Sequence, residues 1–368
     1  MKRARWIHIS SSAPQDLRGG VQSYVDRISR LMSTVADHSI IVARLPPSNP
    51  APLPSTYLGI GGRNRLARIV EMVKALWTCY SVRSTFFVHY LPHYVLGPRL
   101  WFRRNVVFVF HGPASLEARA EKKSKIYCSA LHAIEVILYS IPRRFICLSS
   151  FSKSLLVQHY GVRPSRITVI PGPLEGAVAP PVYEKPRSET VRLLSVRRLV
   201  KRMGLERAIE AVSCLEERGY SVELRIVGLG PEKDALETLG AQRGINLTLL
   251  GKLDDAELEA QYRWADVFVL PTVSLEGFGM VILEAVQRGL PVVGTPVGAI
   301  PEVISQLGHP NIVARSIEPD AIADAISACI QDLSSTAISS ALARMESAYG
   351  HSVIQDLYKT YLRSMDDA

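Results

Sequence analysis

The chain has 368 residues, which is more than one hydrophobic core usually serves, so we expect two domains. Hydrophobic residues make up 47% of it and charged residues 21%, which argues against a disordered protein. Between residues 1 and 175 we count 24 Lys and Arg against 8 Asp and Glu, a net charge of +16, whereas the remainder carries −7. The basic half favours an anionic membrane or a phosphate-bearing acceptor, and no nucleic-acid motif accompanies it.

In the first half, short apolar strands alternate with helices. The pair Gly19-Gly20 precedes a helix that runs from Val21 to Leu31. The expected strands cover residues 6–9, 40–43, 85–89, 106–110 and 145–148. This alternation predicts a parallel sheet with helices on both faces. Five prolines between residues 169 and 192 then predict an interdomain linker.

Beyond the linker the alternation restarts. Expected strands cover residues 191–196, 222–227, 246–250, 267–270 and 291–293, and expected helices cover 205–218, 232–242, 255–264, 279–288 and 319–331. A last helix near residues 354–363 follows. We therefore expect an α/β protein with two Rossmann-like, doubly wound domains facing a cleft. They comprise residues 1–175 and 190–345, with residues 346–368 as a C-terminal helix packing back across the linker.

Cysteine usage and the apolar runs bear on the compartment. The five cysteines are widely spaced without a C-x-x-C pair, which predicts a reducing environment and no zinc site. No apolar run reaches the roughly 18 residues of a membrane span. We expect a cytoplasmic protein with peripheral contact on the inner membrane face. Residues 122–144 and 63–83 are candidate basic amphipathic helices, and an ordinary core helix is an equally weighted alternative for each.

The loop 274–279 leads from a buried strand into an apolar helix. In open parallel sheets, ligands bind beyond the carboxyl ends of the strands. The first amides of a helix lack partners within it and carry the positive end of its dipole, which suits a diphosphate. Gly277 and Gly279 allow the backbone to approach a ligand, and Phe278 and Met280 complete the expected donor-binding turn.

Charged residues surround this turn. A carboxylate can accept hydrogen bonds from two neighbouring hydroxyls, so Glu276 suits a sugar and Glu284 a ribose. A helix cap and a solvated helix residue are the less favoured alternatives. The loop 197–204 supplies four cations, of which Arg198, Lys201 and Arg202 are the expected diphosphate partners. A solvated basic turn is the alternative for each.

Three further sequence features are weaker indications of ligand binding. Gly19-Gly20 could form a second anion-binding turn at a helix start. His111 follows the strand 106–110 and so lies at its carboxyl end, where a structural hydrogen-bonding role is the alternative. Gly228-Leu-Gly230 fits a nicotinamide-cofactor fingerprint poorly, because Lys233 stands where a third glycine is needed. An oxidoreductase is therefore disfavoured.

With these residues in place, the chain resembles the retaining glycosyltransferases of family 4, which have the two-Rossmann GT-B fold. The most specific match is Glu276-Gly-Phe-Gly-Met-Val-Ile-Leu-Glu284, which is similar to the family's E-x7-E motif. Supporting matches are Gly19-Gly20, His111-Gly-Pro113, Ser149-Ser-Phe-Ser152, Arg198-Leu199 with Gly204, Trp264-Ala-Asp-Val-Phe-Val-Leu-Pro271, Gly289-Leu-Pro-Val-Val and Gly298-Ala-Ile-Pro-Glu302.

The resemblance implies roles for the same residues. Glu276 and the amides of Phe278 and Gly279 would hold the transferred sugar, and Glu284 would hold the ribose. Arg198 would hold the diphosphate, His111 would meet the sugar from the other domain, and Gly19-Gly20 would border the acceptor side. Glu276, His111 and Arg198 are thus the predicted catalytic residues. The family needs no metal or other cofactor, since the nucleotide diphosphate sugar is a substrate, and we interpret Asp254-Asp255 and Asp366-Asp367 as solvated.

Two departures from the family pattern stand out. Met203 occupies the position where the family usually has a Lys, so Lys201 or Arg202 would have to replace it. The interdomain turn reads Pro171-Gly-Pro-Leu-Glu175 instead of the usual Pro-Asn-Gly-Val-Asp. We infer nothing from that turn.

The expected activity is retaining transfer of a hexose from a nucleotide diphosphate sugar to a hydroxyl of a lipid-linked, polysaccharide or other glycan acceptor. The resemblance implies front-face attack, in which the leaving phosphate takes the acceptor proton. Two alternatives stay open on the sequence: a nucleotide-sugar epimerase or hydrolase on the same fold, and a non-catalytic nucleotide-sugar-binding protein.

Overall fold

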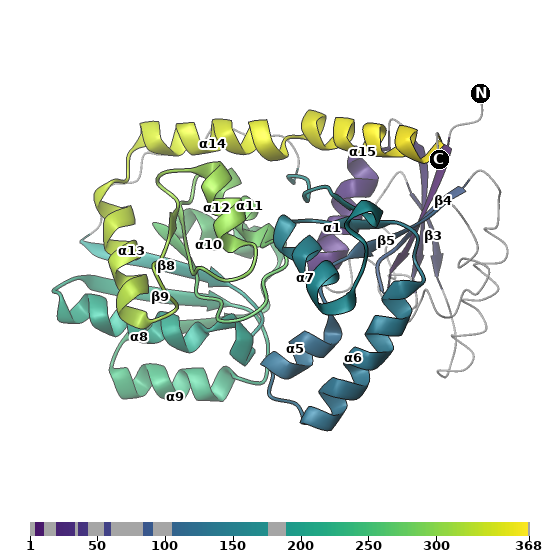
Figure 1. The fold of residues 1–368 in the computed structure, drawn as a ribbon. Helices are drawn as coiled ribbons and strands as arrows, with labels where there is room; N and C mark the ends of the chain where they lie inside the picture. Colours follow the sequence, from purple (N-terminus) through teal and green to yellow (C-terminus); the bar gives the residue numbers. More distant parts are fainter. Residues whose placement is uncertain are drawn as a thin grey trace. The chain divides into compact units, whose positions relative to one another are not determined.

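A computed structural model of the chain divides into two α/β units (Figure 1). The first unit comprises Met1–Ser115, Ile126–Glu175 and His351–Ala368, and the second comprises Leu116–Lys125 and Gly176–Gly350. The residues that the structure describes are 4–10, 20–33, 36–42, 55–59, 84–90, 105–175 and 189–366. Gly19, the candidate helix at 63–83 and most of the expected linker therefore lie outside the described residues.

The sheet of the first unit has its strands in the order β3-β2-β1-β4-β5-β6-β7, and all of these pairs are parallel. The strands are β1 Ala4–Ser10, β2 Ala36–Val42, β3 Ser55–Gly59, β4 Ser84–Val88, β5 Val106–Phe110, β6 Phe145–Cys147 and β7 Ile167–Val169. Every residue of β5 is buried, which fits a central strand covered on both faces. The order reverses between β1 and β4, so this sheet is doubly wound.

Helices pack on this sheet, and the last helix of the chain is one of them. They are α1 Gly20–Leu31, α6 Lys125–Ser140, α7 Ser150–Tyr160 and α15 His351–Asp366, and a shorter helix, α5 Ala114–Ala120, links the two units in sequence. In α15, the hydroxyl of Tyr358 hydrogen-bonds that of Tyr24 in α1, and Gln355 Nε2 donates to Leu31 O over 2.7 Å. The chain thus returns to the first unit at His351, directly after Gly350 ends the preceding helix.

The sheet of the second unit has the order β10-β9-β8-β11-β12-β13 and is also parallel throughout. The strands are β8 Thr190–Val196, β9 Ser221–Val227, β10 Asn246–Gly251, β11 Val267–Leu270, β12 Val292–Gly294 and β13 Ile312–Val313. The helices between them are α8 Leu205–Glu217, α9 Lys233–Arg243, α10 Asp255–Trp264, α11 Met280–Gln287, α12 Ile300–Leu307, α13 Pro319–Gln331 and α14 Ser335–Tyr349. The order reverses between β8 and β11, which makes this a second doubly wound sheet.

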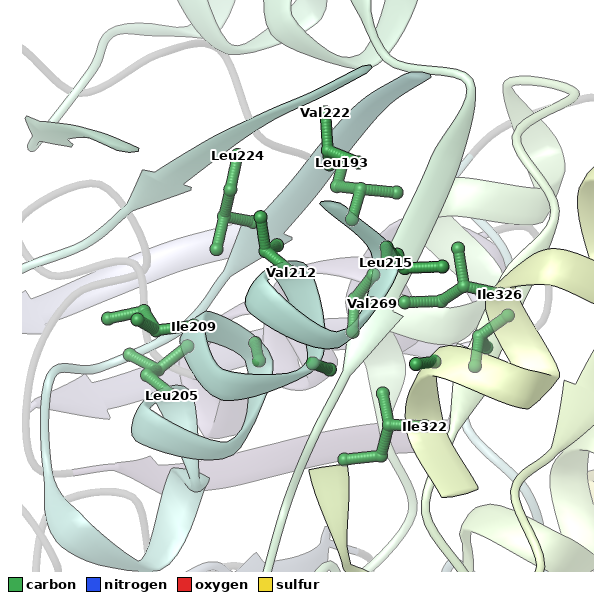
Figure 2. Packing of buried hydrophobic residues seen from close by; sticks show 14 of the residues in the cluster. Leu193, Leu205, Ile209, Val212, Leu215, Val222, Leu224, Val269, Ile322 and Ile326 are labelled. Carbon is green, nitrogen blue, oxygen red and sulfur yellow. The ribbon is translucent and has the colours of Figure 1, made fainter. Parts of the chain in front are cut away.

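One hydrophobic layer fixes the second unit (Figure 2). It joins the sheet to α8 and α13, and its labelled members are Leu193, Leu205, Ile209, Val212, Leu215, Val222, Leu224, Val269, Ile322 and Ile326. All of these side chains are at most 3% exposed. Burying a side chain of this size contributes about 1.5–3 kcal/mol. The layer therefore holds the strands, and the loops at their carboxyl ends, in fixed positions.

The structure contains several strands and helices that the sequence analysis did not expect. The strands β3, β7 and β13 and the helices α5, α7, α12 and α14 were not expected from the sequence. The strands β7 and β13 have three and two residues, too few for an alternating pattern, and α14 is rich in Ser and Ala and has little apolar periodicity. Asp254, interpreted as solvated, is exposed and forms a capping box with Glu257 at the start of α10.

Candidate functional site

The candidate site of the second unit lies where its strand order reverses. The strands β8 and β11 are neighbours in the sheet, and the loops 197–204 and 271–279 leave their carboxyl ends. In doubly wound sheets, ligands bind in the crevice at this point of reversal. The residues expected to hold the donor lie on these two loops and in α11, so the structure brings them to one edge of one sheet.

Arg202 joins the two loops. Its side chain is 6% exposed, its Nη1 donates to Leu275 O over 2.9 Å, and its Nη2 lies 3.1 Å from Glu117 Oε1. The backbone amide of Val273 donates to Arg202 O over 3.0 Å. Burial lowers the pKa of Arg202, and the carboxylate of Glu117 opposes that shift. The side chain thus braces the loop that carries Glu276, and its role in binding a diphosphate stays a prediction.

The backbone at Glu276 is held from the other side by the loop after β12. The amide of Ala299 donates to Glu276 O over 2.9 Å, and a Cβ on Gly298 would lie 2.3 Å from the same oxygen. Only glycine permits this approach. Beyond Glu276, the ring of Phe278 is 4% exposed and packs edge-on against Tyr349, with 5.8 Å between ring centroids. These contacts therefore hold the opening turn of α11 in a fixed position.

The carboxylate of Glu276 pairs with Arg197. Arg197 Nη2 donates to Glu276 Oε2, and the two side chains are 7% and 13% exposed. The same nitrogen lies 3.1 Å from Thr272 Oγ1 and 2.9 Å from the Met203 sulfur. Within the described part of the chain, the buried Nε of Arg197 has no hydrogen-bond partner. The guanidinium next to Glu276 therefore comes from the first of the loop's four cations, which sequence reasoning counted but did not select.

The other two cations of that loop, Arg198 and Lys201, are exposed. Gly228 and Gly230, the weak cofactor signal of the sequence, pack against the same loop. A Cβ on Gly228 would lie 1.8 Å from Arg197 O, and one on Gly230 would lie 2.1 Å from Leu199 O. Close packing of two loops thus accounts for this glycine pair without a nicotinamide cofactor.

Glu284 lies on α11 five residues after Gly279, about 7.5 Å along a helix. Its Oε2 is 3.5 Å from the hydroxyl of Tyr262 in α10, and its backbone oxygen accepts from Arg288 Nη1 over 3.0 Å. Arg288 also lies over the Tyr262 ring, 4.8 Å from its centroid. Tyr262 was not selected from the sequence, because nothing in a helix of mixed composition marks the residue that faces another helix.

The remaining predicted residues, His111 and Gly20, belong to the first unit. Gly20 is exposed and begins α1. His111 directly follows β5, as expected, and its Nε2 lies 3.0 Å from Nδ1 of His89. Burial lowers the pKa of His111 to about 3, so its imidazole is neutral. The contact with His89 could not be predicted from the sequence, since it depends on the order of strands in the sheet.

Comparisons with known proteins address both halves of the chain. Residues 18–175 match the family profile described as Glycosyltransferase Family 4, and residues 183–342 match that described as Glycosyl transferases group 1. The chain belongs to glycosyltransferase family 4. This is a family of transferase enzymes, and membership does not favour the epimerase, hydrolase or non-catalytic alternatives.

Two curated relatives of this family 4 chain are named as biosynthesis glycosyltransferases. The putative colanic acid biosynthesis glycosyltransferase WcaL of Escherichia coli K12 is 32% identical over 159 residues, 41% of this chain and 36% of the relative. The amylovoran biosynthesis glycosyltransferase AmsK of Erwinia amylovora is 30% identical over 241 residues, 62% of this chain and 54% of the relative. The match spans about a third of WcaL and about half of AmsK.

Solved structures show the fold of the family 4 chain. Sucrose-phosphate synthase of Thermosynechococcus elongatus superposes with a TM-score of 0.81 at 18% identity and covers 100% of both chains. HepE of Anabaena, in complex with UDP and glucose, superposes with a TM-score of 0.75 at 19% identity and covers 98% of this chain and 100% of its own. The expectation of two Rossmann-like α/β domains of the GT-B class is confirmed.

Proposed function

We propose that this chain is a retaining glycosyltransferase that moves a hexose from a nucleotide diphosphate sugar to a hydroxyl of a lipid-linked or glycan acceptor. The observation that carries the proposal is the opening turn of α11 at the strand reversal, with Glu276 before it and Glu284 within the helix. HepE has been solved with UDP-glucose as well as with UDP and glucose. A uridine nucleotide sugar is therefore the first donor to test.

The diphosphate would lie against the opening amides of α11, whose dipole favours an anion. Its charge would be neutralised from the loop 197–204. Met203 supplies no charge, and Arg197, whose guanidinium touches the Met203 sulfur, joins Lys201 and Arg202 as a candidate to replace the absent Lys. No metal ion is needed in this arrangement, because the loop's cations provide the counter-charge.

The proposed reaction follows from these positions. The acceptor hydroxyl attacks the anomeric carbon on the face from which the diphosphate leaves. The diphosphate departs with the bonding electron pair, and its oxygen takes the proton of the hydroxyl, so configuration is retained. Glu276 accepts hydrogen bonds from hydroxyls of the sugar, and Arg197 orients that carboxylate by donating a hydrogen bond to it. This proposed step forms no covalent bond between the sugar and the protein.

The test is donor turnover by Glu276→Gln. The purified protein is incubated with a lipid extract and labelled UDP-, GDP- or ADP-sugars, and the product's anomeric configuration is read by NMR. We expect transfer to fall by about 10²–10³-fold, the range for losing one transition-state contact of this kind. Glu237→Gln on the exposed face of α9 is the control and should transfer normally. Transfer by Glu276→Gln at the wild-type rate would show that the site is misassigned.

We also propose that the acceptor is reached at an anionic membrane surface, through α6. Four large apolar side chains of α6 are strongly exposed: Ile126 at 85%, Tyr127 at 54%, Ile134 at 52% and Ile137 at 64%. An ordinary core helix would bury such residues. A helix that presents an apolar face to solvent and cations at its end is typical of an interfacial helix.

Charge on α6 supports the same proposal. Lys125 begins the helix, and Lys122 and Lys123 stand just before it; all three are exposed. The one acidic residue of α6, Glu135, is 2% exposed and accepts from the amides of Ala114 and Ser115. The exposed face is therefore apolar and cationic. Among the described residues, no helix is long and apolar enough to cross a bilayer. The contact that we propose is peripheral, on the cytoplasmic side.

A further inference from the structure

Three histidines form a row in the first unit. His8 lies in β1, His89 directly follows β4, and His111 directly follows β5, and these strands are neighbours in the sheet. Nδ1 of His8 is 3.1 Å from Nε2 of His89, and Nδ1 of His89 is 3.0 Å from Nε2 of His111. The strand order thus lines up three imidazoles that are 81 and 22 residues apart in sequence.

The rings meet edge to edge through their nitrogens. The centroids of His8 and His89 are 5.4 Å apart with 23° between the planes, and those of His89 and His111 are 5.3 Å apart with 27°. Rings stacked face to face would approach to about 3.5–4.0 Å. Both nitrogen distances lie within the hydrogen-bond range. The contacts are therefore two N–H···N hydrogen bonds lying near the planes of the rings.

Packing keeps the row in place. His8 and His89 are 1% and 3% exposed. The ring of Tyr24 stands edge-on to His89 and His111, with centroids 5.9 and 5.2 Å away, and its hydroxyl bonds Tyr358 of α15. Burial lowers the pKa of His111 to about 3, so this ring is neutral at ordinary pH.

The hydrogen bonds couple the three rings. A neutral imidazole has one N–H and one lone pair. His89 uses both of its nitrogens, so if it donates to His8 it must accept from His111, and if it donates to His111 it must accept from His8. The first arrangement leaves a lone pair at Nδ1 of His111, and the second leaves an N–H there. The direction of the hydrogen bond between His8 and His89 therefore determines whether Nδ1 of His111 presents an N–H or a lone pair to a ligand.

We infer that His8 and His89 are positioning residues that hold His111 in a single neutral tautomer. A benefit of the fixed tautomer for sugar transfer rests on the proposed function, whereas the existence of a single tautomer does not. A His111 with a fixed donor or acceptor at Nδ1 can recognise one hydroxyl geometry without first reorganising, which is how preorganised polar groups favour a transition state.

The first measurement is a ¹⁵N–¹H correlation of the imidazole nitrogens in the full-length, ligand-free protein labelled at histidine. His111→Asn identifies the signals of His111. We expect one nitrogen of His111 to have the shift of a protonated nitrogen and the other that of a lone-pair nitrogen, and likewise for His89, with the same direction along the row. Averaged shifts at His111, which mean exchange between tautomers, would overturn the inference.

Variants then break the row at two places. His8→Phe removes the far end, and His89→Phe removes the direct partner of His111. In each folded variant we expect the difference between the two nitrogen shifts of His111 to shrink, while His159→Phe, an exposed change on α7, leaves it unchanged. Unaltered His111 shifts in either folded variant contradict the inference. Because the wild-type spectrum tests it alone, a variant that fails to fold does not remove the test.

The transfer assay separates this inference from the proposed function. If both hold, His8→Phe should lower kcat by about tenfold and change KM for the donor little. A single tautomer in a protein that transfers no sugar would support the row and contradict the proposed function. Sugar transfer by a protein whose His111 exchanges between tautomers would support the proposed function and contradict the inference about the histidine row.

Discussion

Arg197 and Glu276 form a buried ion pair at the proposed donor site, and this pair sets the local charge. Both side chains are largely excluded from solvent, so screening by water is weak. Removing one member of such a pair leaves an uncompensated charge and is much more costly than removing both. A diphosphate next to an unpaired Glu276 would be repelled. We therefore propose that Arg197 acts on the donor through Glu276, through the phosphates, or through both.

Replacement of Arg197 should separate these routes. We expect Arg197→Met to weaken UDP binding at least about tenfold, which is 1.4 kcal/mol, because it leaves Glu276 unpaired beside the phosphates. Adding Glu276→Gln should restore part of that affinity if Arg197 acts through the carboxylate, and none if it binds phosphate. Titration calorimetry measures the UDP affinity of the single and of the double variant.

Arg243→Met, on the exposed side of α9, is the matched control and should bind UDP as the wild type does. UDP affinity unchanged by Arg197→Met would remove this residue from the donor site and leave the exposed Arg198 and Lys201 as the phosphate partners.

For the proposed donor site, the sequence pattern singles out the acidic residues more clearly than the basic ones. Glu276 and Glu284 flank glycines and an apolar helix start, and this local pattern defines their positions. The four cations of the loop 197–204 have no such pattern. Which guanidinium turns inward depends on the path of the loop and on Thr272 and Met203, which surround Arg197 only after folding.

Helix α6 illustrates what a helical pattern predicts and what it leaves open. Periodicity shows which residues share a face, but it does not show what covers that face. The sequence alone therefore gave equal weight to a core helix and an interfacial one, and the exposure of Ile126 and Ile137 supports the interfacial interpretation.

Vesicle binding tests this interpretation of α6. We expect the protein to sediment with vesicles that contain phosphatidylglycerol and much less with pure phosphatidylcholine. Changing Lys122, Lys123 and Lys125 to Ser should cost about 1 kcal/mol per residue at an anionic surface, or roughly a hundredfold in total. Ile134→Glu with Ile137→Glu should weaken binding to the same vesicles, because these changes place charge on the apolar face.

Lys233→Ser, a single change on α9 of the second unit, is the control and should bind vesicles normally. Equal binding to neutral and anionic vesicles, or normal binding by both groups of α6 variants, would contradict the proposal for α6.

The two units have the same architecture, and the alternation of strands and helices in the sequence predicted it. Both sheets are parallel and doubly wound, with reversals between β1 and β4 and between β8 and β11. The spatial order of strands was not predictable residue by residue, because parallel neighbours are joined through helices and pair over long sequence separations. For that reason the histidine row was missed, although each of its members lies in or directly after an expected strand.

The proposed function requires that a nucleotide diphosphate sugar binds at the start of α11. A ligand that binds only the folded protein stabilises it by about 2.7 kcal/mol at a hundred times its Kd, which raises Tm. A thermal-shift panel of UDP-, GDP- and ADP-sugars, each beside its bare nucleoside diphosphate, therefore tests it in wild type, Glu276→Gln and Glu284→Gln. We predict that one nucleotide series raises the Tm of the wild type. Glu284→Gln should reduce the shift for the nucleotide and its sugar alike, and Glu276→Gln only the extra shift due to the sugar. No shift with any member of the panel, or equal shifts in all three proteins, would contradict the account.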